Sequence, residues 1–155
     1  MFKVDFKGLD EIEKALHRLA KVVAPGEIEK DLYAGADIIT QEVRRRAKQG
    51  PTGNLKKGAV TKVLRRLNPS QPAPVISAMD YNIAPHYHLI EKGTKERTPR
   101  TKKVMYNKQT GKVFGVKARG VEKAPFFEPS VEAKMNAATT EILNRLGKRI
   151  DEAVK

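Results

Sequence analysis

Two histidines and a glutamate in one short stretch are the residues whose types come nearest to a catalytic or metal-binding set. His86 and His88 are two residues apart, so on a strand both imidazoles would point to the same side, and Glu91 follows closely. A zinc enzyme needs a third ligand and a general base. The remaining histidine, His17, falls in a different predicted helix, and no H-E-x-x-H spacing occurs. We therefore interpret the pair as partly buried histidines that pack against an aromatic neighbour, and predict no metal site.

Other catalytic and cofactor-binding motifs have no support in the sequence. Cysteine is absent, which excludes thiolate ligands, cysteine nucleophiles and disulfides, and none of the three serines stands in a G-x-S-x-G elbow. The glycines form neither of the phosphate-binding loops G-x-x-x-x-G-K-[ST] and G-x-G-x-x-G. Carboxylate pairs such as Glu27 and Glu29 open predicted helices, where the helix dipole accounts for them. We predict a protein without catalytic residues or a cofactor.

The chain is strongly basic. Its 155 residues include 31 Lys and Arg against 18 Asp and Glu, a net charge of +13, so its surface attracts polyanions or acidic proteins. Residues 41–66 hold nine basic and one acidic residue, and residues 92–123 hold eleven and two. No RNP, KH or helix-turn-helix signature accompanies these clusters, so base-specific recognition is not expected. Two interpretations of the basic clusters follow. They contact nucleic-acid phosphates, or they form a surface that faces solvent or an acidic protein.

The elements that must position these residues follow from the apolar periodicity. Helices are predicted over residues 9–23, 28–47 and 129–154. Strands are predicted over residues 2–6, 59–67 and 75–79, with a short further element over 87–90. The apolar spacing of residues 59–67 would also suit a short helix, but their β-branched content favours a strand. Residues 103–116 predict a β-hairpin whose loop contains Gly111 at positive φ.

These elements predict an α+β fold, in which a small antiparallel sheet packs with three amphipathic helices and a basic β-hairpin protrudes. The length predicts a single domain over residues 1–155, with residues 95–123 as an extended basic arm. No apolar run approaches the roughly 20 residues that a membrane span needs, and the N-terminus lacks the apolar core of a signal peptide. We therefore expect a soluble chain.

Several short sequence segments, here called phrases, together resemble a known family in their order along the chain. The phrases are Pro51 to Lys57, Ala84 to Thr94, Lys103 to Tyr106, Gly111 to Phe114 and Ala124 to Pro129. With a helix pair before them and a closing helix after them, they resemble the head-to-tail joining and tail-completion family of long-tailed bacteriophages, which includes relatives of the lambda-type minor tail protein Z. The resemblance spans nearly the whole chain.

The resemblance implies a non-enzymatic virion protein. In that family setting the chain forms a ring of six copies around the DNA channel and joins the head-closure protein to the tail terminator or tail tube. It would be assembled in the cytoplasm of the bacterial host and reside in the neck, at the top of the tail. The basic arm would contact an acidic neighbouring ring or DNA phosphates in the channel. The alternative of another class is a basic nucleic-acid-binding protein without base specificity.

The candidate assembly residues lie in three of these phrases. Gly53 can adopt positive φ and Asn54 can bond its own backbone, so the chain can turn back after a long helix. Glu91 to Thr94 closes one element and opens the arm. The candidate assembly residues are Thr52, Gly53, Asn54, Leu55, Glu91, Gly93, Thr94, Phe126, Phe127 and Pro129.

Two aromatic residues and the basic arm are further candidates for contacts with a partner. Phe126 and Phe127 cannot both face one core from a regular strand, so either one anchors a neighbouring chain or the two pack on different sides beneath the last helix. The candidate arm residues for a partner or for DNA phosphates are Arg97, Arg100, Lys102, Lys103, Lys108, Lys112, Lys117 and Arg119.

Overall fold

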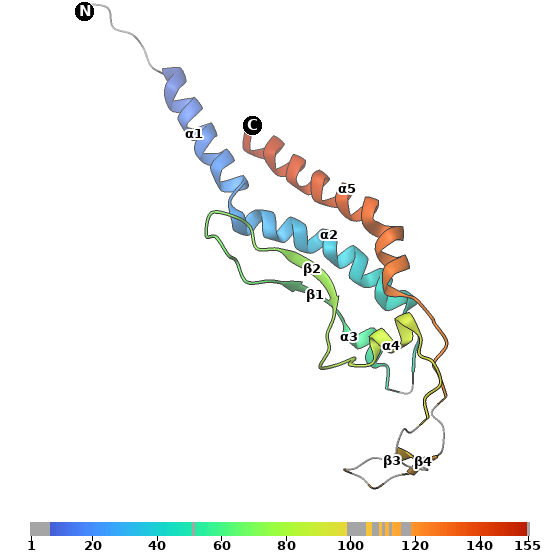
Figure 1. The fold of residues 1–155 in the computed structure, drawn as a ribbon. Helices are drawn as coiled ribbons and strands as arrows, with labels where there is room; N and C mark the ends of the chain where they lie inside the picture. The colour runs from blue at the N-terminus through green and yellow to red at the C-terminus, as the bar shows by residue number, and fades with distance from the viewer. Residues whose placement is uncertain are drawn as a thin grey trace, which may run out of the picture.

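The computed structural model describes residues 7–50, 52–98, 105–106, 109, 111, 113–115 and 119–154 (Figure 1). The elements in chain order are α1 (Lys7–Val22), α2 (Pro25–Arg46), α3 (Asn54–Gly58), β1 (Ala59–Val63), β2 (Val75–Met79), α4 (Tyr87–Lys92), β3 (Met105–Tyr106), β4 (Val113–Gly115) and α5 (Phe127–Val154). The fold is α+β with a two-stranded antiparallel sheet, as predicted. The strand predicted over residues 2–6 lies outside the described residues.

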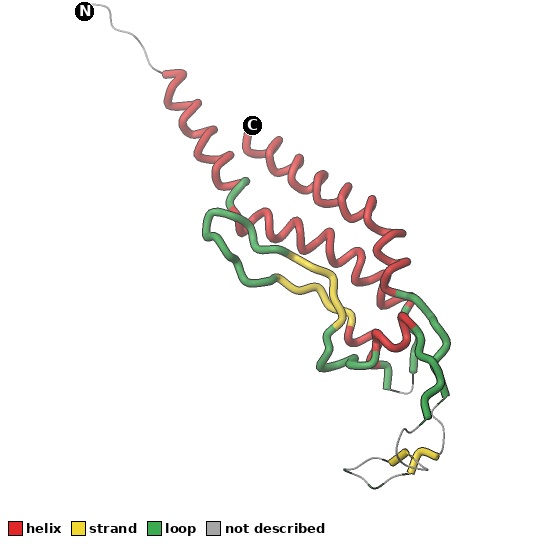
Figure 2. Tube along the Cα trace, in the orientation of Figure 1, coloured by secondary structure: helices red, strands yellow, loops and turns green. Residues whose placement is uncertain are grey.

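Helix α2 is the centre of the fold. The β1–β2 ribbon packs on one side of it and α5 on the other, so the long helices do not all share the sheet (Figure 1). Helix α1 packs against α5 and runs on past the C-terminal end of that helix. The short helices α3 and α4 lie near the start of α5, and the β3–β4 hairpin projects beyond them (Figure 2).

The sequence explains where α2 begins and why it approaches α5 so closely. Pro25 stands in the first turn of α2, where a proline costs no helical hydrogen bond. Helix α2 therefore begins at Pro25, three residues before the predicted start at residue 28. Gly35 faces α5, and a Cβ there would lie 2.5 Å from the Ile142 side chain. The absence of a side chain at Gly35 thus allows the two helices to meet.

The β1–β2 ribbon is shorter than predicted. Ala59 pairs with Met79 and Val63 with Val75, so β1 ends at Val63 and does not continue to residue 67. The reason lies on the opposite strand, where Pro72 and Pro74 have no N–H to donate to a longer ladder.

Two predicted local features differ from the structure. The turn at residues 52–55 continues into the short helix α3, which the sequence pattern did not predict. The short element over residues 87–90 is a helix, α4, so His86 precedes a helix and His88 lies within it. Residues two apart on a helix point about 200° apart, and the two imidazoles therefore do not share a side.

The buried core is small for a chain of this length. Among the described residues, the buried apolar ones are Val43, Ala47, Ala59, Ala73, Ala84, Phe126, Ala138 and Ala153, six of which are alanine. The whole chain exposes 12097 Å² of surface, whereas a compact monomer of 17.3 kDa exposes about 7,800 Å². The fold is therefore extended and leaves much apolar surface uncovered.

None of the helices in the described part of the chain combines the length and the apolar character that crossing a bilayer requires.

Candidate functional site at the base of the arm

The structure brings together two of the phrases that the sequence singled out, at the point where the arm leaves the body. Glu91, near the end of α4, accepts hydrogen bonds from the backbone N–H groups of Phe126, Phe127 and Glu128, with N···O distances of 2.9, 3.1 and 3.1 Å. The first N–H groups of a helix have no partner within it, and a carboxylate also suits the positive end of the helix dipole. Glu91 therefore caps α5 from a distant part of the chain.

The two segments that lead into the arm pair directly with each other. The Thr94 N–H donates to the Val121 carbonyl oxygen at 2.8 Å, and the Val121 N–H donates to the Thr94 hydroxyl oxygen at 2.9 Å. The Ala124 N–H donates to the Ile90 carbonyl oxygen at 3.0 Å. We call residues 90–94 together with residues 120–128 the arm base.

Glycines allow the two segments of the arm base to come this close. Gly93 has a φ of +72°, and a Cβ there would lie 2.9 Å from the Lys123 nitrogen. A Cβ at Gly120 would overlap the Thr94 carbonyl oxygen. Both positions therefore require glycine, one for its backbone conformation and its space, the other for its space alone.

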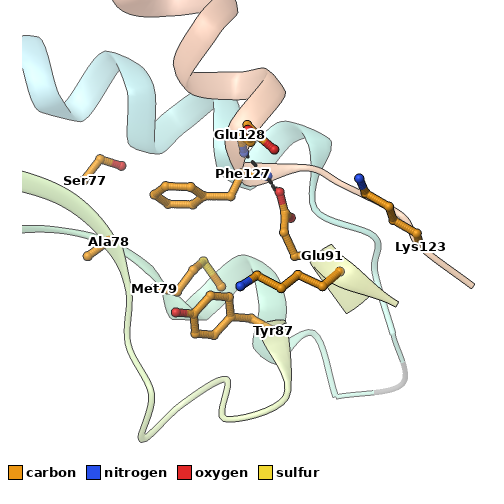
Figure 3. Close-up of a pocket in the computed structure, with 9 residues that line it drawn as sticks. Ser77, Ala78, Met79, Tyr87, Glu91, Lys123, Phe127 and Glu128 are labelled. Atoms are coloured by element: carbon orange, nitrogen blue, oxygen red, sulfur yellow. Dashed lines mark hydrogen bonds between the residues drawn. The ribbon is translucent and has the colours of Figure 1, made fainter. Parts of the chain in front are cut away.

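A cavity of about 600 Å³ opens beside the arm base (Figure 3). Its lining residues are Ser77, Ala78, Met79, Tyr87, Glu91, Lys92, Lys123, Phe127 and Glu128. The Phe127 ring points toward Ala78 and Met79 of β2, while Phe126 is buried in the core. Phe127 is half-buried and packs against the same core that contains Phe126, and Pro129 lies in the first turn of α5.

The phrase at residues 52–55 forms a second joint, on the other side of α4. Gly53 has a φ of +65°, as predicted. The Asn54 N–H donates to the Thr52 hydroxyl oxygen at 3.4 Å, and Leu55 packs against the core. A cavity of about 170 Å³ separates this joint from residues 83–90.

The basic residues of segment 41–66 are largely occupied within the chain. Arg45 and Arg46 both donate to the Glu42 carboxylate, at distances from 2.6 to 2.9 Å, and these hydrogen bonds lower the pKa of Glu42 to about 2. Lys62 donates to Asp80 at 2.8 Å. The remaining contacts of this segment are those of Arg44 with the Ala59 carbonyl oxygen, Lys56 with Gln49, and Arg66 with Glu29. Six of its nine cationic side chains therefore have a hydrogen-bond partner within the chain.

The structure describes two of the candidate basic residues of the arm. Arg97 and Arg119 are exposed where the arm begins and ends. The other candidate arm residues lie outside the described part of the chain, and they are Arg100, Lys102, Lys103, Lys108, Lys112 and Lys117. The hairpin itself is present, since β3 pairs antiparallel with β4 and Gly111 has a φ of +67°.

Two buried polar networks were not predicted from the sequence. Thr40 on α2 shares hydrogen bonds of 2.8 Å with Thr61 and with Ser77 on the two strands. Arg149 on α5 binds Glu27 and Asp31 on α2. These networks fix the ribbon and α5 against α2, but the sequence contains no signal that would pair residues so far apart along the chain.

The polar contacts described at the arm base are hydrogen bonds from backbone N–H groups to a carboxylate, a hydroxyl and backbone carbonyl oxygens.

Both His86 and His88 are exposed, which corrects the prediction that they are partly buried, and the Tyr87 ring meets the His88 ring edge-on at 5.8 Å. Among the residues that the structure describes, no group of three or more His, Asp or Glu side chains is placed to hold a metal ion.

Comparisons of the chain with protein-family models, with curated proteins and with solved structures found no match.

Proposed function

We propose that this chain is a structural subunit of the neck of a long-tailed bacteriophage, a tail-completion protein that forms a ring and joins the head-closure protein to the tail terminator. Its role is mechanical joining, with no chemical step. The body made of α2, α5 and the β1–β2 ribbon supplies rigidity, and the arm makes the contacts with adjacent subunits or rings.

The observation that carries this proposal is the extended shape of the chain. Its surface exceeds that of a compact monomer by about 4,000 Å², which is in the range that obligate assemblies bury. Eight buried apolar residues among those described, six of them alanine, make a small core for a chain that works alone. Burial against neighbouring copies would compensate for this modest core.

The arm base supports the proposal further, because it anchors a projecting segment firmly to the body. Glu91 and Thr94 make five of the hydrogen bonds that join the segments before and after the arm. A segment that reaches a neighbour transmits its contact to the body only if its own attachment is fixed. The phrases that carry the resemblance to the phage family include both sides of this attachment.

The proposal is tested by deleting residues 98–117 from the chain in a phage genome that encodes it. We expect the shortened protein to remain folded, because the core residues that the structure describes all lie outside this segment. Heads and tails should then accumulate unjoined in electron micrographs, and infectious titre should be lost. Infectious, fully joined particles would contradict the proposal.

A matched control keeps the arm and changes a surface elsewhere. Gln71→Ala alters an exposed side chain in the loop between β1 and β2, away from the arm base. This variant should produce joined particles at the wild-type titre. Circular dichroism of both purified variants would separate a failure to join from a failure to fold.

A nucleic-acid-binding protein is the second candidate, and the charge of residues 92–123 favours it. It predicts that the purified chain binds duplex DNA with a steep salt dependence, in which the logarithm of affinity falls by about 0.9 per phosphate contacted for each tenfold rise in salt. Fluorescence anisotropy over a salt series, with the arm-deleted chain as the control, measures this. Tight binding that disappears with the arm, in a chain that does not assemble, would favour this candidate over the first.

A further inference from the structure

One face of α5 is exposed and uncharged, in a chain in which 32% of the residues are charged. Between residues 135 and 144 the exposed side chains are Met135, Asn136, Ala137, Thr139, Thr140, Leu143 and Asn144. Met135 retains 51% and Leu143 61% of its accessible surface. Depletion of charge is what distinguishes the centre of a protein interface from ordinary surface. We call these seven exposed residues the neutral face of α5.

Helix α1 is half covered along its apolar stripe. Ala15, Leu19 and Val22, on one edge of the stripe, are half-buried. Ile12 and Leu16, on the other edge, retain 57% and 60% of their accessible surface. A helix with so marked an apolar side normally buries the whole of it, so the edge with Ile12 and Leu16 lacks a partner in the described structure.

The chain does not cover either surface itself. Figure 1 shows the C-terminal part of α1 beside the C-terminal part of α5, while the rest of α1 runs away past the end of that helix. The neutral face lies at the middle of α5, and Met135 and Leu143 stay exposed there although α1 packs against the same helix. Both surfaces are therefore uncovered in the described part of the chain.

We propose that α1 of one copy packs, through Ile12 and Leu16, on the neutral face of α5 in a second copy of this chain. The contact extends a pairing that each copy already makes internally, since α1 and α5 pack together within one chain. It rests on the proposed function, in that both need the chain to assemble with itself, and it names the surfaces involved.

The proposed contact has the asymmetry that a ring requires. It uses two different surfaces, α1 on one side and α5 on the other, so each copy can bind one neighbour through each surface. Such head-to-tail contacts form a ring when the successive rotations return to the first copy, and an open filament when they do not. A symmetric pairing of α1 with α1 would instead stop at a dimer.

The absence of cysteine in the chain allows a direct cross-linking test. The full-length double variant Leu16→Cys with Leu143→Cys is oxidised at a concentration where the wild-type chain assembles. We expect a ladder of disulfide-linked species on a denaturing gel, rising to the number of copies in the ring. Each single variant should give at most the level of dimer that random collision produces.

A matched control pairs Leu16→Cys with Leu67→Cys, which lies in the loop between β1 and β2 and retains 91% of its surface. This pair should give no ladder. Strong self-dimerisation of Leu16→Cys alone, or a double variant no more cross-linked than the control pair, would overturn the proposed contact. A chain that stays monomeric at every concentration tested would overturn it as well.

A second variant tests the neutral face without engineered cysteines. Thr140→Lys introduces one charge at an exposed position of this face and should raise the concentration for half-assembly by about tenfold. Gln71→Lys adds the same charge to an exposed loop position and should leave assembly unchanged. Equal assembly of the two variants would contradict the proposal.

Sedimentation and particle assays separate this inference from the proposed function. If the wild-type chain forms rings and joins heads to tails, but the cysteine pair does not cross-link, then only the contact is wrong. If the cysteine pair cross-links into a ladder, but particles without the chain are complete and infectious, then the contact stands and the proposed function fails.

Discussion

Glu91 shows how one side chain can connect parts of a chain that are far apart in sequence. Its carboxylate holds the first N–H groups of α5, and its own helix is followed immediately by the arm. The sequence marks Glu91 only as part of a phrase, because its partners are 35 to 37 residues away. Its role becomes visible once the helix that it caps is in place.

Replacing Glu91 by alanine should lower the free energy of unfolding by about 1–2 kcal/mol, the usual effect of removing a helix cap. Glu91→Gln, which keeps an acceptor oxygen but loses the charge, should restore part of that loss. Urea denaturation followed by circular dichroism measures both. Glu122→Ala removes an exposed carboxylate nearby and is the control. Equal stability of Glu91→Ala and the control would show that the cap contributes nothing.

Glu42 should contribute to the acid sensitivity of the fold. Hydrogen bonds from Arg45 and then Arg46 lower its pKa to about 2 in the folded chain, while an unfolded glutamate has a pKa of about 4.3. The stabilisation by its ionised form is therefore complete above about pH 5 and is lost as the pH falls toward 2.

The expected outcome is that Glu42→Gln is less stable than the wild-type chain at neutral pH and that this difference shrinks as the pH falls from 5 to 2. Urea denaturation at a series of pH values measures it. Glu132→Gln, an exposed position on α5, controls for the removal of one carboxylate. A difference between Glu42→Gln and the wild type that stays constant with pH would contradict the linkage.

At the scale of elements, the packing of α2 against α5 depends on one position without a side chain. A Cβ at Gly35 would lie 2.5 Å from two side-chain carbons of Ile142 and 3.0 Å from the Ala138 carbonyl oxygen. The carbonyl belongs to the backbone of α5 and cannot turn aside. The two helices would have to separate to admit a methyl group.

Gly35→Ala should therefore lower the free energy of unfolding by about 1–3 kcal/mol, as overpacking does. Gly147→Ala is the matched comparison, because the space around it within α5 is open. That variant should be more stable than the wild type by up to about 1 kcal/mol, since alanine favours a helix. Thermal unfolding of both variants would test the pair, and the same sign of effect at both positions would refute the close approach.

The elements themselves could largely be predicted from the sequence, because each depends on local periodicity. The three long helices, the strand at residues 75–79 and the hairpin at the arm follow from apolar spacing and turn residues. The early end of β1 required knowing that Pro72 and Pro74 stand opposite it, which depends on the register of the ribbon. The short helices α3 and α4 lack the length over which a helical period can be recognised.

The candidate site could be predicted in part only. The sequence predicts that residues 91–94 and 126–129 contain assembly residues, yet nothing local indicates that Glu91 binds the backbone at the start of α5. The network of Arg149 with Asp31 and the shared hydroxyls of Thr40 and Thr61 also depend on tertiary contacts. Charge counts also do not reveal that six cations of segment 41–66 have hydrogen-bond partners within the chain, five of them while remaining exposed.

At the scale of the whole molecule, stability and assembly should be coupled. If copies assemble as proposed, each contact would cover apolar surface that the isolated chain exposes, and binding that favours the folded state raises its apparent stability. The melting temperature should therefore rise with protein concentration over the range in which sedimentation shows assembly. Thr140→Lys, which weakens the proposed contact, should flatten this dependence. A melting temperature independent of concentration in a chain that assembles would contradict the coupling.

The capping of α5 by Glu91 has a mechanical consequence. Tension on the arm would enter the body at the start of a 28-residue helix, about 42 Å long, and run along its axis. The three hydrogen bonds that Glu91 accepts at the start of α5 would then share the force and would not break one after another. A ring built from such subunits would resist being pulled apart while a filament of DNA is driven through it.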